Sequence, residues 1–241
     1  MQEIDRRFST SSGDLHQRCV INGMLGMGKT QLALKFAAAA FQRGQYVYVF
    51  WVSAVSVEKV TQNFAKLADR VRLPGRHRLD QASKPSAMRA WLEDSTGARS
   101  WLVVLDNVSE ETVGMLRDVL PRGDCGGRLL MTTRVATIAD LFTASEASSQ
   151  LALQPPGIGD AVAMLSAGAK LERVEGRKEA SHADAERLVR SVSNLPLAID
   201  QAASYIRETG SKVQKVLDVY QSEKAPEVRD NNGKHKGQTV G

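Results

Sequence analysis

Apolar residues gather in five short runs along the 241 residues of this chain. The runs are Cys19–Asn22, Tyr46–Val52, Trp101–Leu105, Arg128–Thr132 and Gln150–Leu153. Continuous apolar runs of this length are typical of strands in a parallel sheet that is covered on both faces. We therefore predict a five-stranded parallel sheet with helices packed against both faces.

The segments between the runs have the periodicity of helices. In the first of them, Leu32, Phe36 and Ala40 fall on one helical face. The predicted helices are Lys29–Phe41, Val57–Val71, Pro85–Asp94 and Glu110–Leu120. Alternating strands and helices imply right-handed crossovers, so we predict the α/β class with three αβα layers.

The pattern changes after Leu153, where Pro155–Gly157 interrupts the chain and only helical periodicity follows. The predicted helices there are Asp160–Ala169, Ala183–Val192, Leu197–Glu208 and Lys212–Gln221. We interpret residues 1–154 as a P-loop nucleotide-binding domain and residues 155–222 as a small helical subdomain. The polar stretch 223–241 cannot bury enough apolar surface to fold, so we predict a disordered tail.

The segment Gly23–Thr30 reads Gly-Met-Leu-Gly-Met-Gly-Lys-Thr and fits the phosphate-loop pattern GxxxxGK[ST]. It follows an apolar run and opens a helix, so its backbone N–H groups and the helix dipole would face bound phosphates. Lys29 is predicted to reach the β- and γ-phosphates of ATP or ADP, and the Thr30 hydroxyl to bind Mg²⁺. The predicted nucleotide contacts are Gly23, Gly26, Met27, Gly28, Lys29, Thr30 and Gln31.

Asp106 follows the apolar run Trp101–Leu105 and so fits the Walker B pattern. We predict a strand that ends at this carboxylate, which would hold Mg²⁺ together with Thr30. The next residue, Asn107, occupies the position where many ATPases place an acid. An amide cannot accept a proton at neutral pH, so we expect at most a slow ATPase.

Arg134 follows Thr132 and Thr133 at the end of the fourth apolar run. If this strand lies beside the phosphate-loop strand, Arg134 faces the γ-phosphate. Its guanidinium could then distinguish ATP from ADP by charge-assisted hydrogen bonds. The alternative interpretation is a surface arginine near the start of a helix.

The composition of the chain argues against several classes of function. The net charge of +5 is modest, aromatic residues make up 5% of the chain, and no arginine-rich stripe appears, which argues against nucleic-acid binding. The two cysteines and four histidines are scattered, which argues against a zinc site and a disulfide framework and favours the reducing cytoplasm. No apolar run is long enough to span a membrane.

The order and spacing of five motifs resemble the NB-ARC domain of STAND P-loop NTPases, found in NLR-type immune and cell-death regulators. These motifs are Gly23–Thr30, Phe50–Ser53, Leu102–Asn107, Thr132–Arg134 and Leu195–Ala198. The runs Leu105–Asn107 and Leu195–Ala202 look most like those of fungal NLR-like proteins. The resemblance covers roughly residues 18–210.

The resemblance implies the sheet order 5-1-4-3-2, with Arg134 beside the phosphate loop as a sensor of the γ-phosphate. It also implies that Pro196 packs against the nucleotide, although by itself Pro196 only fits the first turn of a helix. The implied function is a signalling switch in innate immunity, ADP-bound at rest and ATP-bound when active. Activation would be coupled to self-association or to other signalling proteins.

The chain departs from the family pattern at Arg6–Gly13, which matches the family's glycine-arginine motif poorly. We also find no winged-helix segment, repeat array or effector domain, so we expect the nucleotide-binding core of such a regulator. Two alternatives remain open. One is a nucleotide-free protein-interaction fragment, and the other is a small P-loop ATPase or kinase.

Overall fold

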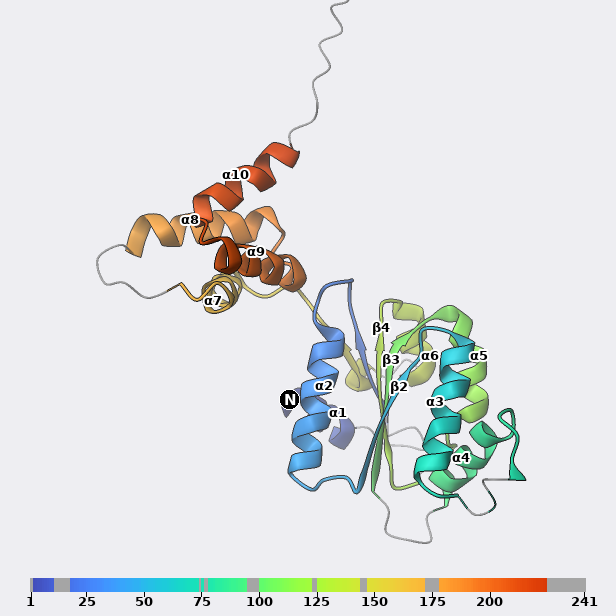
Figure 1. The fold of residues 1–241 in the computed structure, drawn as a ribbon. Helices are drawn as coiled ribbons and strands as arrows, with labels where there is room; N and C mark the ends of the chain where they lie inside the picture. The colour runs from blue at the N-terminus through green and yellow to red at the C-terminus, as the bar shows by residue number, and fades with distance from the viewer. Residues whose placement is uncertain are drawn as a thin grey trace, which may run out of the picture. The chain divides into compact units, whose positions relative to one another are not determined.

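The computed structural model describes residues 2–10, 18–73, 75, 78–94, 100–122, 125–143, 147–171 and 178–224. The chain forms two compact units, Met1–Pro155 and Pro156–Gly241. Figure 1 shows a sheet with helices on both faces in the first unit, and helices in the second.

The first unit contains one sheet of five parallel strands. The strands are β1 (Arg18–Asn22), β2 (Tyr48–Ser53), β3 (Trp101–Val108), β4 (Arg128–Thr133) and β5 (Gln150–Ala152). Their order is β2-β3-β4-β1-β5, which confirms the predicted order 5-1-4-3-2 read from the other edge. Residues 101–105 of β3 are all buried, as expected for a central strand covered on both faces.

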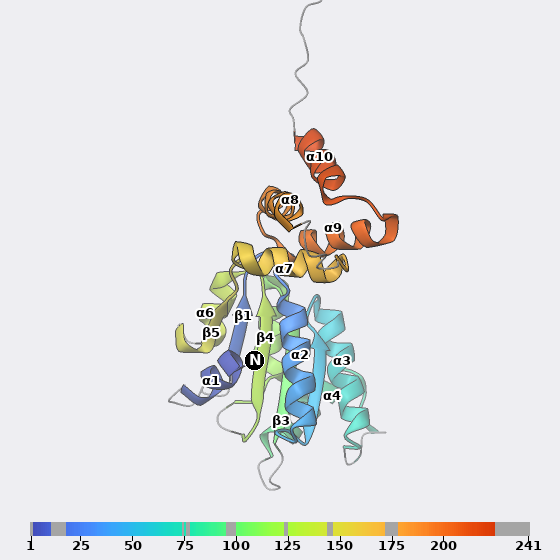
Figure 2. The same ribbon diagram turned by 90° about the vertical axis from the view of Figure 1, so that its left-hand side faces the viewer.

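Helices cover both faces of this sheet. They are α1 (Gln2–Thr10), α2 (Lys29–Gln42), α3 (Val57–Arg70), α4 (Lys84–Glu93), α5 (Glu110–Val119) and α6 (Ala136–Thr143), with a 3-10 turn, η2 (Ala147–Ser149). Side chains of α1 and α2 bury one face, and side chains of α3 to α6 bury the other. Figure 2, seen from the first of these sides, shows α2 in front of the sheet. The fold class is therefore the predicted three-layer αβα.

Two helices of the first unit were not predicted from the sequence. In α1, Ile4 and Phe8 lie one turn apart and are both buried, and the Phe8 ring lies 6.0 Å from that of Phe36 in α2. In α6, Ile138 and Phe142 are buried in the same way. α1 spans nine residues and α6 eight, so each pattern covers only about two turns, and packing against the sheet stabilises these short helices.

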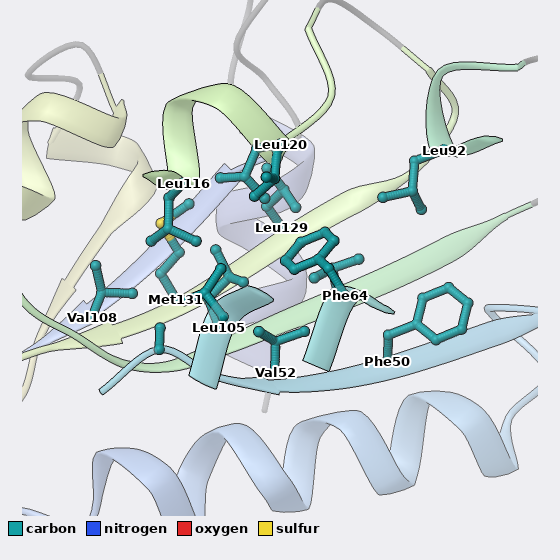
Figure 3. Close-up of a cluster of buried hydrophobic side chains, with 14 of the residues drawn as sticks. Phe50, Val52, Phe64, Leu92, Leu105, Val108, Leu116, Leu120, Leu129 and Met131 are labelled. Carbon is teal, nitrogen blue, oxygen red and sulfur yellow. The ribbon is translucent and has the colours of Figure 1, made fainter. Parts of the chain in front are cut away.

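The larger apolar core lies between the sheet and the α3–α6 side. Because successive residues of a strand point to opposite faces, Val103 and Leu105 enter this core while Leu102 and Val104 enter the other. Figure 3 shows Leu105, Leu129 and Met131 of the strands meeting Phe64 of α3 and Leu116 of α5. These side chains fix the register in which β3 and β4 pair.

The second unit is helical and has its own core. Its helices are α7 (Ile158–Gly168), α8 (Lys178–Ser191), α9 (Pro196–Thr209) and α10 (Val213–Lys224). Leu165, Leu188, Ile199 and Leu217 are almost fully buried among them. The tail predicted at 223–241 overlaps the last two residues of α10, and from 225 onward it lies outside the described residues. No helix in the described ranges is long and apolar enough to cross a membrane.

Replacing a core phenylalanine tests this packing. Phe64 is fully buried, so we expect Phe64→Ala to lower the free energy of unfolding by about 3–5 kcal/mol. Phe41 on α2 is 59% exposed, so the matched control Phe41→Ala should cost much less. Urea unfolding followed by tryptophan fluorescence measures both, because all three tryptophans belong to the first unit. Equal losses would contradict the packing described.

Candidate functional site

The phosphate loop, Gly23–Thr30, connects the end of β1 to the first turn of α2. Gly28 precedes the helix with φ at 82°, in the left-handed region that suits glycine. The first backbone N–H groups of α2 and the positive end of its dipole therefore lie at the loop. Of the predicted contacts, Met27 is buried, Thr30 and Gln31 are exposed, and four are partly buried: Gly23, Gly26, Gly28 and Lys29.

The start of the loop is packed against the end of β5. A Cβ atom at Gly23 would lie 3.1 Å from the carbonyl oxygen of Leu153, tighter than ordinary van der Waals contact. The adjacent Leu153 N–H donates to the Asn22 carbonyl at 2.8 Å. Glycine at position 23 is therefore required by this close approach as well as by its φ of 147°.

The ammonium of Lys29 folds back over the loop. It donates to the carbonyl oxygens of Gly23 and Met24, each at 2.7 Å. Partial burial lowers the pKa of Lys29, the charge of Arg134 lowers it further, and the charge of Asp106 raises it. Lys29 thus lies within electrostatic reach of both other charged site residues predicted from the sequence.

Arg134 lies at the same edge of the sheet as the phosphate loop. β4 pairs with β1 so that Thr133 is opposite Asn22, and the residues that follow, Arg134 and Gly23, leave the sheet together. The interpretation of Arg134 as a γ-phosphate contact required that its strand lie beside the phosphate-loop strand, and this pairing meets that condition. The side chain is exposed, and its charge acts on Lys29.

Asp106 and Thr30 contact each other near the carboxyl end of β3. The Thr30 hydroxyl donates to Asp106 Oδ1 at 2.8 Å, and the Thr132 hydroxyl donates to the same oxygen at 2.7 Å. Thr132 was predicted from the sequence to lie at the end of its strand, with no function assigned to it. Its position two residues before Arg134, on the strand neighbouring β3, was the signal that could have identified it.

β3 does not end at Asp106, as the sequence predicted, but continues to Val108 through a bulge. Leu105 pairs with Met131 and Val108 with Thr133, so Asp106 and Asn107 together face a single residue of β4. Asn107 is exposed and has φ at 62°, a conformation that asparagine tolerates better than most residues. A bulge depends on the neighbouring strand, so the apolar run alone did not reveal it.

The oxygens at this point fit a hard divalent cation. A hydroxyl and a carboxylate are ligands that Mg²⁺ accepts, and it usually takes few protein ligands together with phosphates and water. The described part of the chain contains no group of three or more His, Cys, Asp or Glu side chains that could hold a metal ion. Thr30 and Asp106 would hold the ion only alongside a bound nucleotide.

Pro196 belongs to the second unit and is the first residue of α9. The turn before it contains Ser193 and Asn194, both with positive φ. The Asn194 side-chain amide donates to the Pro156 carbonyl at 3.1 Å, which ties the start of this unit to the start of α9. The nucleotide contact of Pro196 stays a prediction.

Comparison with known proteins gives a family and a relative. The model of the NB-ARC domain family matches residues 2–158, a range that includes α1. A nucleotide-binding leucine-rich repeat (NLR)-like protein of the fungus Hyaloscypha variabilis is 30% identical over 221 residues. That match covers 86% of this chain and 21% of the fungal protein.

Solved structures with a similar fold are P-loop NTPases. Drosophila ORC bound to DNA has a TM-score of 0.62 at 12% identity, covering 92% of this chain and 60% of that one. Cdc6p of Pyrobaculum aerophilum has a TM-score of 0.55 at 14% identity, covering 81% and 57%. At such identities the likeness shows the fold alone. The fold, the family match and the fungal relative together show that the chain belongs to the NB-ARC family of nucleotide-binding P-loop NTPase domains.

Proposed function

We propose that this chain is the nucleotide-dependent switch of an NLR-like signalling regulator, with ADP bound at rest and ATP bound when active. The observation that carries the proposal is the convergence of Thr30 and Asp106, 2.8 Å apart, at the mouth of an intact phosphate loop. These oxygens would hold Mg²⁺, which supplies positive charge to the nucleotide phosphates when bound. The family match supports nucleotide binding by the same loop.

Each remaining charged residue has a distinct part in the proposal. The Lys29 ammonium would exchange the loop carbonyls for the β- and γ-phosphates. Arg134, whose charge already acts on Lys29, would contact the γ-phosphate, which only ATP has. A guanidinium there binds ATP more strongly than ADP, and ATP biases the switch by as much as its affinity for the active state exceeds its affinity for the resting state. Pro196 would contact the nucleotide from the helical unit and couple this difference to it.

Asn107 makes the proposed switch a slow ATPase at most. Next to the Walker B carboxylate, an amide does not accept the proton of an attacking water. An ATP-bound state that hydrolyses slowly persists long enough to signal, which suits a switch better than a motor. On the resemblance to NB-ARC domains of NLR-type regulators, we further propose a role in innate immune signalling in the cytoplasm, with self-association or other signalling proteins as partners.

Loss of the Lys29 ammonium should abolish most nucleotide affinity. We expect Lys29→Ala to weaken ADP and ATP binding by roughly 10- to 100-fold, because a charge-assisted hydrogen bond to phosphate is lost. Titration calorimetry with and without Mg²⁺ measures the change. Lys35→Ala, an exposed lysine on the same helix, is the matched control and should bind like the wild type. A folded wild-type chain that binds neither nucleotide would instead favour the protein-interaction alternative.

A carboxylate at position 107 should speed up hydrolysis. Aspartate has the shape of asparagine and tolerates the left-handed conformation, so we expect Asn107→Asp to raise ATP turnover by roughly 100-fold. Phosphate release at saturating ATP is the measurement. Asn63→Asp on α3 introduces the same charge elsewhere and should have no effect. Wild-type turnover of many molecules per second would contradict the switch.

The pKa of Lys29 reports whether Arg134 lies at the phosphate loop. Since the charge of Arg134 lowers this pKa and that of Asp106 raises it, Arg134→Gln should raise it and Asp106→Asn should lower it. Carbon-13 NMR titration of labelled lysine follows Lys29, whose signal is assigned by its loss in Lys29→Arg. Arg117→Gln on α5 is the control. An unchanged pKa in Arg134→Gln would remove Arg134 from the site.

A further inference from the structure

The hydroxyl of Thr132 contacts both the candidate metal ligand and the backbone beside it. It donates to Asp106 Oδ1 at 2.7 Å and accepts the N–H of Asn107 at 2.8 Å. We propose that Thr132 is a positioning residue, which holds the Asp106 carboxylate in the orientation that binds Mg²⁺. This inference rests on the proposed Mg²⁺–nucleotide site and adds to it a residue that does not touch the ion.

Because Thr132 is buried in the sheet, its hydroxyl can hold the Asp106 carboxylate in one orientation. Its side chain is 1% exposed and projects from β4, a central strand that pairs with β1 and β3. Asp106 is partly exposed and Thr30 is exposed on the first turn of α2. Of the two hydroxyls that donate to Oδ1, the one from Thr132 is therefore held by the sheet. Partners of this kind orient metal ligands and raise the affinity for the ion.

The bulge in β3 explains why a hydroxyl is needed at this position. Asp106 and Asn107 face Thr132 together where the register shifts, and the Asn107 N–H donates to the Thr132 hydroxyl. A threonine hydroxyl has one hydrogen to donate and lone pairs to accept, so it binds the carboxylate and this N–H at once. Valine has the same shape and can do neither, whereas serine keeps both functions.

The neighbouring Thr133 provides a matched control. It is also buried to 1% exposure, but its hydroxyl donates to the Val108 carbonyl at 2.9 Å and accepts the Val135 N–H at 3.2 Å. Successive strand residues point to opposite faces, so Thr133 lies on the far side of the sheet from Asp106. Thr133→Val thus removes a comparable pair of hydrogen bonds from the same strand without altering the carboxylate.

The experiment separates binding of the ion from binding of the nucleotide. A fluorescent ADP analogue is titrated into the full chain in EDTA, and the complex is then titrated with MgCl₂. We expect Thr132→Val to bind ADP in EDTA like the wild type but to need roughly 10- to 100-fold more Mg²⁺ for the same tightening. Thr132→Ser and Thr133→Val should require the wild-type Mg²⁺ concentration.

The possible results distinguish this inference from the proposed function. If the wild type shows Mg²⁺-dependent tightening and Thr132→Val keeps it, the positioning role is wrong while the metal site stands. If the wild type shows no Mg²⁺ dependence, the metal site itself is wrong and the inference falls with it. Equal loss in Thr132→Val and Thr133→Val would show a structural effect and also overturn the inference. Should Thr132→Val not fold by circular dichroism, Thr132→Ala is compared with Thr132→Ser in the same way.

Discussion

The parallel pairing of β1 with β4 decides where the candidate site lies. Parallel strands bring their carboxyl ends to one edge of the sheet, which is where ligands bind in open α/β folds. With Asn22 opposite Thr133, the phosphate loop and Arg134 leave this edge together. Apolar residues stabilise the register, because a slip of one position would exchange the side chains packed on the α2 face with those packed on the α3–α6 face.

The polar residues of the candidate site follow directly after apolar residues that point to the same face of the sheet. On β3, Leu102, Val104 and Asp106 alternate toward the α2 side, and on β4 the same side receives Leu130 and then Thr132. The row therefore changes from apolar to polar within two residues, at the level where α2 begins with Thr30 in its first turn. Packing that stabilises the fold also sets the distance between the hydroxyl and carboxylate oxygens.

The strands and the phosphate loop could be predicted from the sequence because each depends on residues close together in the chain. Uninterrupted apolar runs identified the five strands, and the spacing of glycines and Lys29 identified the phosphate loop. The backbone conformation of Asn107 could not be predicted from the sequence, because it depends on a hydrogen bond to the Thr132 hydroxyl, 25 residues further along the chain. The helix that contains Ile4 and Phe8 was not predicted either, because its apolar face is recognisable only once Phe36 is known to pack against Phe8.

The contact between Gly23 and Leu153 joins the start of the phosphate loop to the last residues of the first unit. Leu153 precedes Pro155 by two residues, and Pro155 is where the first unit ends. A methyl group at position 23 would push on the Leu153 carbonyl, and so on the strand end from which the chain leaves for the helical unit. Position 23 therefore carries a double constraint, in which the end of β5, within the first unit, limits the residue that opens the phosphate loop.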